Sequence, residues 1–383
     1  MILSRFPFPL EKGDKLRAFN QIKALSEKHQ VYVFCITSKK PTSEMIQALS
    51  PYCKEICWYQ SSKMKILLNL FRVMLNGKPW QNAFFVFKKA KKKLQEFVHE
   101  IRPNHVFVQG VRMADYAKKI DIPKTLDYED AFSVRMLRFA GDTKNLMYRI
   151  VYKSAYRRLK RAETKMFDNF DYKLIISEAD RTFINHPKRD EILIVRNGVD
   201  LDFFKPDSDV PKTADLLFVG NLTYPPNIQA VDFLVNKIMP KLLQKNTSIK
   251  LLIAGANPPQ AWQKHQSENV QILVNPKDIR DAYNATKIFV APMMTGTGLQ
   301  NKLLEAMAMK LPCITTSLAN LGLQAKPNSE ILIAETADEF VNQILYLQNH
   351  PDVCQQLSEQ AFEFVSQSFS WKKEVEKWVN KIS

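Results

Sequence analysis

The sequence predicts an α/β protein made of two doubly wound, parallel-sheet domains of the Rossmann-like kind. Its 383 residues exceed one average domain and suit two of roughly 150 to 200 residues. Short apolar runs typical of buried strands alternate with helix-like stretches, which is the order of a parallel sheet with helices on both faces. Glycine is scarce, at ten residues, yet the following glycines all fall at predicted strand-to-helix turns: Gly13, Gly220, Gly255, Gly296 and Gly298.

Composition argues against several classes of protein. The five cysteines are odd in number and form no paired CxxC array, which argues against a disulfide framework or structural zinc and favours a reducing cytoplasm. No run of about 18 apolar residues occurs, and Met1 leads almost directly into a strand-like start, so we expect neither secretion nor a membrane span. The formal charge of +16 requires an acidic partner: nucleic acid, anionic headgroups or a phosphorylated substrate. Because no nucleic-acid-reading module is recognisable, nucleic acid is not predicted as a partner.

The first predicted domain spans residues 1–203. Pro7 and Pro9 end a brief apolar start, and Gly13 precedes a helix with an apolar stripe. The strand candidates that follow are 31–36, 56–59, 105–108, 124–128, 174–177 and 192–195. Because ligands on such sheets bind beyond the carboxyl ends of strands, the turns of interest are 109–110, 127–133 and 177–178.

Residues 63–93, KMKILLNLFRVMLNGKPWQNAFFVFKKAKKK, mix large apolar side chains with lysine and arginine. Two amphipathic segments, broken at 77–79, could lie in a membrane interface with Trp80, Phe84, Phe85 and Phe87 inserted and the lysines on anionic headgroups. The alternative is that the apolar face packs in the core and the lysines form a solvated face.

Acidic residues follow the predicted strand KTLDY and recur after 196. Either Asp127 or Asp130 could accept hydrogen bonds from hydroxyl groups of a ligand, and an acidic helix N-cap is the competing interpretation. Asp200 and Asp202 spell DxD, a pattern that can hold a divalent metal in some proteins. No further ligand-rich segment supports such an ion, so we interpret this DxD as structural and predict no metal site.

The second predicted domain spans residues 204–369. Its strand candidates are 215–219, 250–254, 270–274, 287–291, 312–315 and 331–334. Gly220 and Asn221 end the first of them. A final helix at 371–379 has one apolar stripe.

The stretch 291–308, APMMTGTGLQNKLLEAMA, predicts a strand end, a glycine-bracketed loop and a helix. Gly296 and Gly298 allow backbone N–H groups to approach a ligand, and the start of the helix suits a phosphate. Lys302 and Glu305 lie three residues apart and can point together toward the loop. The lysine would neutralise diphosphate oxygens, and the carboxylate would accept hydrogen bonds from hydroxyl groups. The alternative is an ordinary capped helix with a surface ion pair.

The run GTGLQNKLLEAMAMKLPCITT resembles the donor-site motif of retaining glycosyltransferases with the GT-B architecture, specifically glycosyltransferase family 4, the glycosyl transferases group 1 proteins. That family commonly has two glutamates separated by seven residues, the second followed by Ala-Met-Ala. Glu305 matches the second glutamate. Thr297 stands where the first belongs, which resembles an exopolysaccharide-associated branch of sugar transferases and leaves open what replaces the first glutamate.

Four further segments resemble this family. PFPLEKGDKLR resembles the first loop, in which Gly13 and Asp14 would reach toward the donor diphosphate; a plain first turn is the alternative. Asp127 stands at about the position of a histidine that contacts the transferred sugar in many members, and it forms D-x-x-D with Asp130 as in the exopolysaccharide branch. RNGVDLDFFKP resembles the linker between the domains. FVGNLTYPPNIQAV resembles the first turn of the second domain but lacks the Arg and Lys that often bind phosphate there, so Lys302 would act alone.

The resemblance implies a two-domain GT-B enzyme whose final segment, 370–383, packs back on the first domain. It also implies a retaining, metal-independent and hexosyltransferase-like glycosyltransferase without a cofactor. It would move a sugar from a nucleotide-diphosphate sugar to a polysaccharide, lipopolysaccharide or lipid-linked acceptor in cell-surface glycan biosynthesis. We expect it in the cytoplasm, with 63–93 as a candidate for peripheral contact with an anionic membrane. The alternatives are a non-catalytic GT-B-like protein that binds glycan or lipid, and a nucleotide-sugar epimerase.

The resemblance also assigns site residues. The expected catalytic residues are Asp127, Asp130, Lys302 and Glu305. The expected donor-binding residues are Gly13, Asp14, Gly220, Asn221, Gly296, Thr297, Gly298, Leu299, Gln300, Asn301, Lys302 and Glu305.

Overall fold

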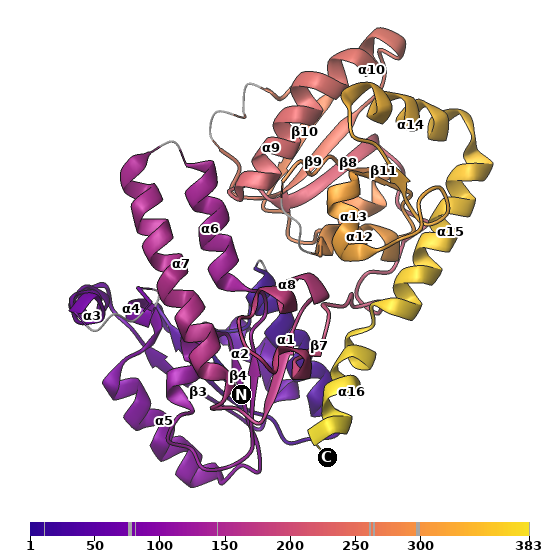
Figure 1. Cartoon of the computed structure of the whole chain (residues 1–383). Coiled ribbons are helices and arrows are strands. Elements are labelled where there is room, and N and C mark those ends of the chain that lie inside the picture. The colour runs from indigo at the N-terminus through magenta and orange to yellow at the C-terminus, as the bar shows by residue number, and fades with distance from the viewer. Residues whose placement is uncertain are drawn as a thin grey trace. The chain divides into compact units, whose positions relative to one another are not determined.

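The computed structural model describes residues 1–10, 12–75, 79–80, 82–143, 145–259, 262, 265–295 and 299–382. The chain divides into two compact units, one formed by Met1–Arg196 with Glu374–Ser383 and the other by Asn197–Lys373. The boundary expected from the sequence, after residue 203, lies a few residues beyond this division. Each unit is built on one sheet of parallel strands (Figure 1).

The first unit has a seven-stranded sheet with the order β3-β2-β1-β4-β5-β6-β7. Its strands are β1 (Ile2–Leu3), β2 (Tyr32–Thr37), β3 (Glu55–Gln60), β4 (Val106–Gln109), β5 (Lys124–Asp127), β6 (Tyr172–Ile175) and β7 (Leu193–Ile194). Its helices are α1 (Gly13–Ser26), α2 (Ser43–Leu49), α3 (Lys63–Leu75), α4 (Asn82–Phe85), α5 (Lys88–Ile101), α6 (Phe132–Asp142), α7 (Leu146–Phe167), α8 (Glu178–Phe183) and most of α16 (Trp371–Ile382).

The central strands of this sheet are apolar on both faces because helices cover both faces. Val33, Phe34 and Cys35 of β2 are all buried, as a parallel strand of a doubly wound sheet requires. The strand order reverses between β1 and β4, which pair through Ile2 and Val108. The loops after these two strands therefore diverge at the carboxyl edge, where such sheets bind ligands.

The second unit has a six-stranded parallel sheet with the order β10-β9-β8-β11-β12-β13. Its strands are β8 (Ala214–Asn221), β9 (Leu251–Ala256), β10 (Val270–Val274), β11 (Thr286–Ala291), β12 (Cys313–Thr315) and β13 (Leu332–Ile333). Its helices are α9 (Pro225–Phe233), α10 (Met239–Lys245), α11 (Arg280–Asn284), α12 (Asn301–Ala308), α13 (Ser317–Leu323), α14 (Ala337–Asn349) and α15 (Pro351–Ser368). The order reverses between β8 and β11, so this sheet has a switch point of the same kind.

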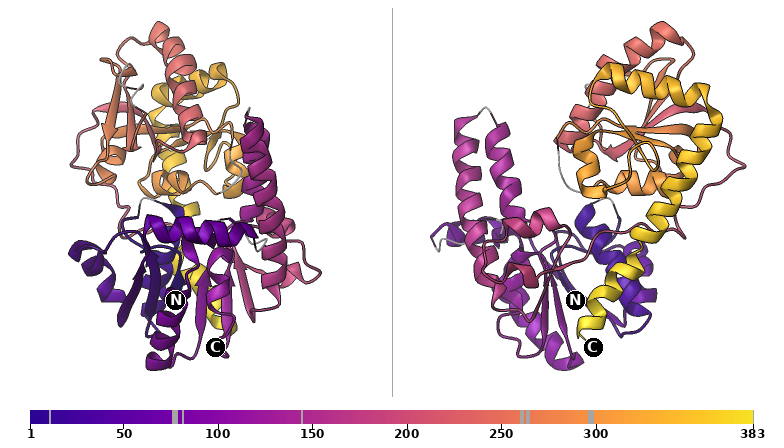
Figure 2. Two further views of the ribbon diagram at one scale, coloured as in Figure 1. Left: turned by 90° about the vertical axis from the view of Figure 1, so that its left-hand side faces the viewer. Right: turned by 45° about the vertical axis from the view of Figure 1, so that its right-hand side comes forward.

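Two long helices of the first unit, α6 and α7, stand side by side as an antiparallel hairpin (Figures 1 and 2). Asn145 caps α7, since its Oδ1 accepts from the backbone N–H groups of Met147 and Tyr148 at 2.9 and 3.3 Å. Leu159 of α7 packs with Met136 of α6 in a small core of their own.

The last helix, α16, packs on the first sheet. Val375, Trp378 and Val379 are buried with residues of β1, β2 and β4. The Trp378 Nε1 donates to Thr125 Oγ1 at 3.1 Å, and its ring centroid lies 4.9 Å from that of Phe107. Residues from opposite ends of the sequence thus share one core.

The segment 63–93 divides between surface and core. Phe87 is buried in the main core of the first unit and Phe85 packs against that core, so the expectation that both insert into a membrane is wrong. The exposed apolar face lies instead on α3, where Met64, Leu67, Leu68 and Phe71 form one stripe and Phe71 is 73% exposed. No helix within the described ranges is long and apolar enough to cross a bilayer.

Every strand candidate of the sequence overlaps a strand of the structure, and the predicted pair of Rossmann-like parallel sheets is confirmed. The brief apolar start forms β1, the central strand from which the order of the first sheet diverges.

Candidate functional site

Close backbone approach defines the carboxyl edge of the second sheet. A Cβ on Gly220, near the end of β8, would lie 2.7 Å from Asn227 Nδ2 and 3.3 Å from Lys302 Nζ. A Cβ on Gly255 of β9 would lie 1.9 Å from the Gly220 carbonyl oxygen. Glycine at 220 leaves room for Lys302 Nζ and Asn227 at the end of β8, and glycine at 255 lets β9 approach the β8 backbone closely.

Lys302 lies on α12 and is buried, with 9% of its surface exposed. Its Nζ donates to Asn227 Oδ1 at 2.5 Å, lies 3.6 Å from Met293 Sδ and lies 4.4 Å from the centroid of the Phe218 ring. Asn227 is in turn held by donation from its Nδ2 to the Asn221 carbonyl at 2.8 Å. Each of these partners is uncharged, and within the described ranges this ammonium has no direct ion pair.

Burial lowers the pKa of Lys302 to about 7, while the charge of Glu305 acts in the opposite direction. A bound anion would supply negative charge at the ammonium and favour its protonated form. The surroundings of Lys302 therefore suit a group such as a diphosphate, and above pH 7 binding of such a group would be coupled to uptake of a proton.

Glu305 lies one helical turn beyond Lys302 and is half-buried. Tyr283 of α11, itself fully buried, donates from its Oη to Glu305 Oε2 at 2.8 Å. Burial raises the pKa of Glu305, whereas the Tyr283 hydrogen bond and Lys302 lower it. Its Oε1 has no hydrogen-bond partner among the residues that the structure describes, so it can accept from a hydroxyl group of a ligand.

The start of α12 adds backbone donors. Gln300 is the N-cap but makes no side-chain capping bond, and the first N–H groups of a helix have no intrahelical acceptor. Asn301 accepts from Asn197 Nδ2 at 3.4 Å, and Leu299 packs against the core of the second unit. The expected donor residues Gly296, Thr297 and Gly298 lie outside the described residues.

The other expected donor residue of this edge, Asn221, uses its side chain locally. Its Oδ1 accepts from the backbone N–H of Thr223 at 3.0 Å and from the Thr223 hydroxyl at 2.7 Å, which closes the turn after β8. Through Asn227, the structure brings Gly220, Asn221 and Lys302 together. Glu305 joins them on the same helix.

In the first unit, Asp127 is fully enclosed. Arg17 donates to it from Nε to Oδ2 at 2.7 Å and from Nη2 to Oδ1 at 3.1 Å, and Gln21 Nε2 donates to Oδ2 at 2.9 Å. The backbone N–H of Glu129 adds a fourth bond at 3.0 Å. These bonds occupy both oxygens of a carboxylate that is 0% exposed, so Asp127 holds α1 against β5. The expectation that Asp127 contacts a sugar is therefore wrong.

Asp130 and Asp14 are more accessible, and each has an arginine partner. Asp130 pairs with Arg135, and Asp14, in the first turn of α1, pairs with Arg5. Gln109 Nε2 at the end of β4 donates to the Asp14 carbonyl at 2.8 Å. Gly13 is exposed at the start of α1. Asp14, in the first turn of α1, and Asp130, in the loop after β5, thus both lie at the carboxyl edge of the first sheet, while a contact of Gly13 or Asp14 with a donor remains a prediction.

Glu129 and Arg112 lie at the same edge and were not predicted as site residues. Glu129 has a φ of 65°, in the left-handed region, and its Oε2 lies 3.7 Å from Arg112 Nη2. Burial raises the pKa of Glu129 to about 8, against the lowering effect of Arg112. The Arg112 guanidinium lies 5.0 Å from the ring centroids of both Phe85 and Phe132. The sequence offered one hint, the acidic run at 127–130, and no signal for Arg112.

The DxD at Asp200 closes a turn, because its Oδ1 accepts from the backbone N–H groups of Asp202 and Phe203, both at 3.1 Å. Within the described ranges, no group of three or more His, Cys, Asp or Glu side chains is placed to hold a metal ion.

Part of the chain matches a known protein family. Residues 213–350, which include β8 to β13 and α12, match the family model of the glycosyl transferases group 1. A Klebsiella pneumoniae protein described as an uncharacterized 44.6 kDa protein in the cps region is 23% identical over 393 residues, covering 96% of this chain and 95% of that protein.

Similar solved structures span the whole chain. Sucrose-phosphate synthase from Thermosynechococcus elongatus superposes with a TM-score of 0.72 at 14% identity, covering 100% of this chain and 97% of the other. HepE from Anabaena, solved with UDP and glucose, gives a TM-score of 0.69 at 11% identity, with 100% and 98% covered. The resemblance seen in the sequence is thus confirmed: residues 213–350 match the model of the glycosyl transferases group 1 family, and the chain has the GT-B fold.

Proposed function

We propose that this protein is a glycosyltransferase that takes a sugar from a nucleotide-diphosphate sugar bound by the second unit. One observation carries the proposal: the buried Lys302, which has no direct ion pair among the residues that the structure describes, lies at the switch point of the family-matched region, one helical turn from the carboxylate of Glu305. The cation suits a diphosphate and the carboxylate suits sugar hydroxyls. The UDP and glucose in the HepE structure support this class of donor.

We infer further that transfer retains the anomeric configuration and needs no metal. An acceptor hydroxyl attacks the anomeric carbon on the face from which the diphosphate departs. As the new C–O bond forms, the bond to the diphosphate breaks and the leaving phosphate oxygen accepts the hydroxyl proton. Lys302 and the N–H groups at the start of α12 stabilise the charge that develops on the diphosphate, as fixed donors do in a preorganised site. Such a reaction needs no strong protein base.

The acceptor in this proposal is a polysaccharide, lipopolysaccharide or lipid-linked glycan. The relative in the Klebsiella pneumoniae cps region supports this class, as does the fold shared with WaaG, a glycosyltransferase involved in lipopolysaccharide biosynthesis, at a TM-score of 0.66 and 15% identity. The exposed apolar stripe of α3 supports an acceptor at a membrane surface, because it carries Lys63 and Lys65 beside Leu67 and Phe71.

A thermal-shift panel of nucleotide-diphosphate sugars tests the donor assignment. A donor at about 100 times its dissociation constant stabilises the protein by roughly 2.7 kcal/mol. We expect Lys302→Met to lose this stabilisation and Lys277→Met, at an exposed lysine of the same unit, to keep it. If no nucleotide sugar stabilises the parent protein, or if both variants respond like the parent, the donor site is misassigned.

A further inference from the structure

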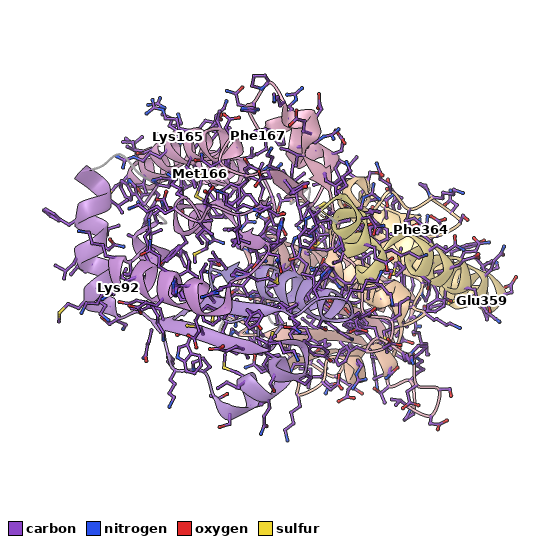
Figure 3. The ribbon with its side chains drawn as sticks, turned by 90° about the horizontal axis from the view of Figure 1, so that it is seen from below. Lys92, Lys165, Met166, Phe167, Glu359 and Phe364 are labelled. Carbon is purple, nitrogen blue, oxygen red and sulfur yellow. The ribbon has the colours of Figure 1, made fainter. Side chains whose placement is uncertain are left out.

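The carboxyl half of α7 forms one side of a groove of about 430 Å³ in the first unit. Its wall is made by side chains of α7 and by one residue of the segment after α8: Tyr156, Arg157, Lys160, Arg161, Thr164, Lys165 and Asn185. Figure 3 labels Lys165 at this end of the helix, beside the buried Met166 and Phe167. The groove is therefore lined by four cations and three neutral hydrogen-bonding side chains, and by no carboxylate.

The cations of this groove are not neutralised by the protein. Arg157, Arg161 and Lys165 are exposed, and none of the three has an acidic partner in the part of the chain that the structure describes. They follow one another at i, i+4 spacing, which places like charges side by side and destabilises the helix. The single carboxylate of α7, Glu163, is buried and accepts from the backbone N–H of Ser133 at 2.9 Å.

The neutral members of the groove complete a set of hydrogen-bonding groups for an oxyanion. Lys160 Nζ lies 3.4 Å from the Tyr156 hydroxyl and 5.8 Å from the centroid of its ring, so lysine and tyrosine present their polar atoms together. Asn185 contributes an exposed amide from outside the helix. Guanidinium and ammonium groups beside hydroxyl and amide donors are what a phosphate group binds.

The same face of α7 becomes apolar toward the tip of the hairpin. Leu146 and Ile150 are exposed and lie on one line with Arg157 and Arg161, at spacings of four and seven residues that keep side chains on one side of a helix. Met147 at the tip is exposed as well. At 1.5 Å per residue, Arg157 is about 10 Å and Lys160 about 15 Å along the helix from Ile150.

We propose that this face of α7 docks on anionic phospholipid, with the tip in the acyl boundary and lipid phosphates in the groove. An interfacial helix lies in the membrane plane with one face entering about 5 to 10 Å. Leu146 and Ile150 would then reach the acyl boundary, while Arg157 and Arg161 on the same face would meet the headgroups. A ligand with a phosphate group and an apolar tail matches both the cationic groove and the apolar tip of this α7 face, whereas a soluble phosphate leaves Leu146 and Ile150 without a role. The inference does not depend on sugar transfer, and its test is a binding measurement.

Sedimentation with vesicles of phosphatidylcholine and phosphatidylglycerol measures this binding. In the groove variant, Arg157, Arg161 and Lys165 are replaced by glutamine; in the matched control, the exposed Lys39, Lys40 and Lys54 of the same unit are replaced by glutamine. We expect the groove variant to bind on the order of a hundredfold more weakly and the control to stay within about fivefold of the parent. Equal loss in the two variants would show diffuse attraction and would overturn the proposal.

Two further variants test the shape of the groove and the apolar tip of the hairpin separately from the charge of the groove. Thr164→Phe fills the groove with every cation kept, and we expect it to lose most of the binding; parental binding by this variant would overturn the groove as the site. Leu146→Ser with Ile150→Ser is expected to lower the binding that persists at high salt, and parental binding at high salt would contradict insertion of the tip. Unchanged thermal midpoints for all variants establish that each is folded.

Two competitors identify the source of the phosphate. Inorganic pyrophosphate at the concentration of lipid phosphate is expected to leave the parent protein on the vesicles. If pyrophosphate binds the parent but not the groove variant and releases the parent from vesicles, the groove takes a soluble phosphate and the lipid assignment is wrong. If a duplex oligonucleotide binds with the same groove-to-control difference as the vesicles, the face is a polyanion site and the lipid assignment is equally wrong.

Discussion

Lys302 makes donor affinity depend on pH in a direction that the structure dictates. In the free protein, burial holds the pKa of this ammonium at about 7 against a usual value of 10.5. A donor diphosphate beside it would raise the pKa back toward the usual value, so above pH 7 the donor binds together with a proton. Affinity should then fall about tenfold per pH unit above pH 7 and level off below it.

Isothermal titration calorimetry measures both quantities. A nucleotide-diphosphate sugar is the appropriate ligand, because its bridging diphosphate does not change protonation in this range. Between pH 6 and pH 8.5 the affinity should drop roughly thirtyfold, and proton uptake, obtained from buffers of different ionisation heat, should rise from ~0.1 to nearly one proton per site.

Variants assign the effect to one residue. Lys302→Met should bind more weakly and without pH dependence, while Lys277→Met should behave as the parent. Glu305→Gln should shift the onset to lower pH, because Glu305 is the group that raises the pKa of Lys302. An affinity that stays within twofold across this range in the parent, or the parental slope in Lys302→Met, would refute the reasoning.

The remaining predictions concern the same site, the first unit and the membrane. Glu305→Gln should lower transfer roughly ten- to a hundredfold with an unchanged thermal midpoint, because it removes a charged acceptor of about 1.5 to 3 kcal/mol, whereas Glu359→Gln on α15 should have no effect; activity within twofold of the parent would contradict the assignment. Burial raises the pKa of Glu129 to about 8, so ionising it costs stability, and the free energy of unfolding should fall as the pH rises from about 4.5 to 8, by at most about 1.4 kcal/mol per unit from this group. In Glu129→Gln, the free energy of unfolding measured by chemical denaturation should fall less steeply with pH than in the parent; the same pH dependence in both proteins would rule out Glu129 as its source. EDTA should leave transfer unchanged, and loss of activity that manganese restores would assign a metal to the site. Leu67→Ser with Phe71→Ser on α3 should weaken vesicle binding at high salt, while Leu321→Ser, at an equally exposed leucine of the second unit, should not; equal binding by all three proteins would leave α3 without a membrane role.

The fold could be predicted because its signals are local. A buried parallel strand is a short apolar run, such as YVFCIT in β2 or TKIFVA in β11, and alternation with helices fixes the rest. The segment 63–93 was harder, since periodicity shows that a face is apolar but not what covers it. Phe87 lies in the core whereas Phe71, sixteen residues earlier, lies on the surface.

The candidate site could be predicted only in part, since its partners come from distant elements. The motif identified Lys302 and Glu305, but the groups that bury and orient them, Asn227 and Tyr283, lie on other helices. Asp127 shows the converse. The position of Asp127 before a loop suggested a ligand contact. Both of its carboxylate oxygens instead accept hydrogen bonds from Arg17, which is 110 residues away in sequence.

The most direct test of the account is transfer itself, measured with the nucleotide sugar that the protein binds and a lipid extract as the acceptor. Radiolabelled sugar entering the lipid fraction and release of the free nucleoside diphosphate are counted in the same reaction. We expect equal amounts of the two products, both dependent on acceptor and both lost in Lys302→Met. A nucleotide sugar that binds and stabilises the protein while neither product forms would contradict the claim, and would identify the chain as a GT-B protein that binds without transfer.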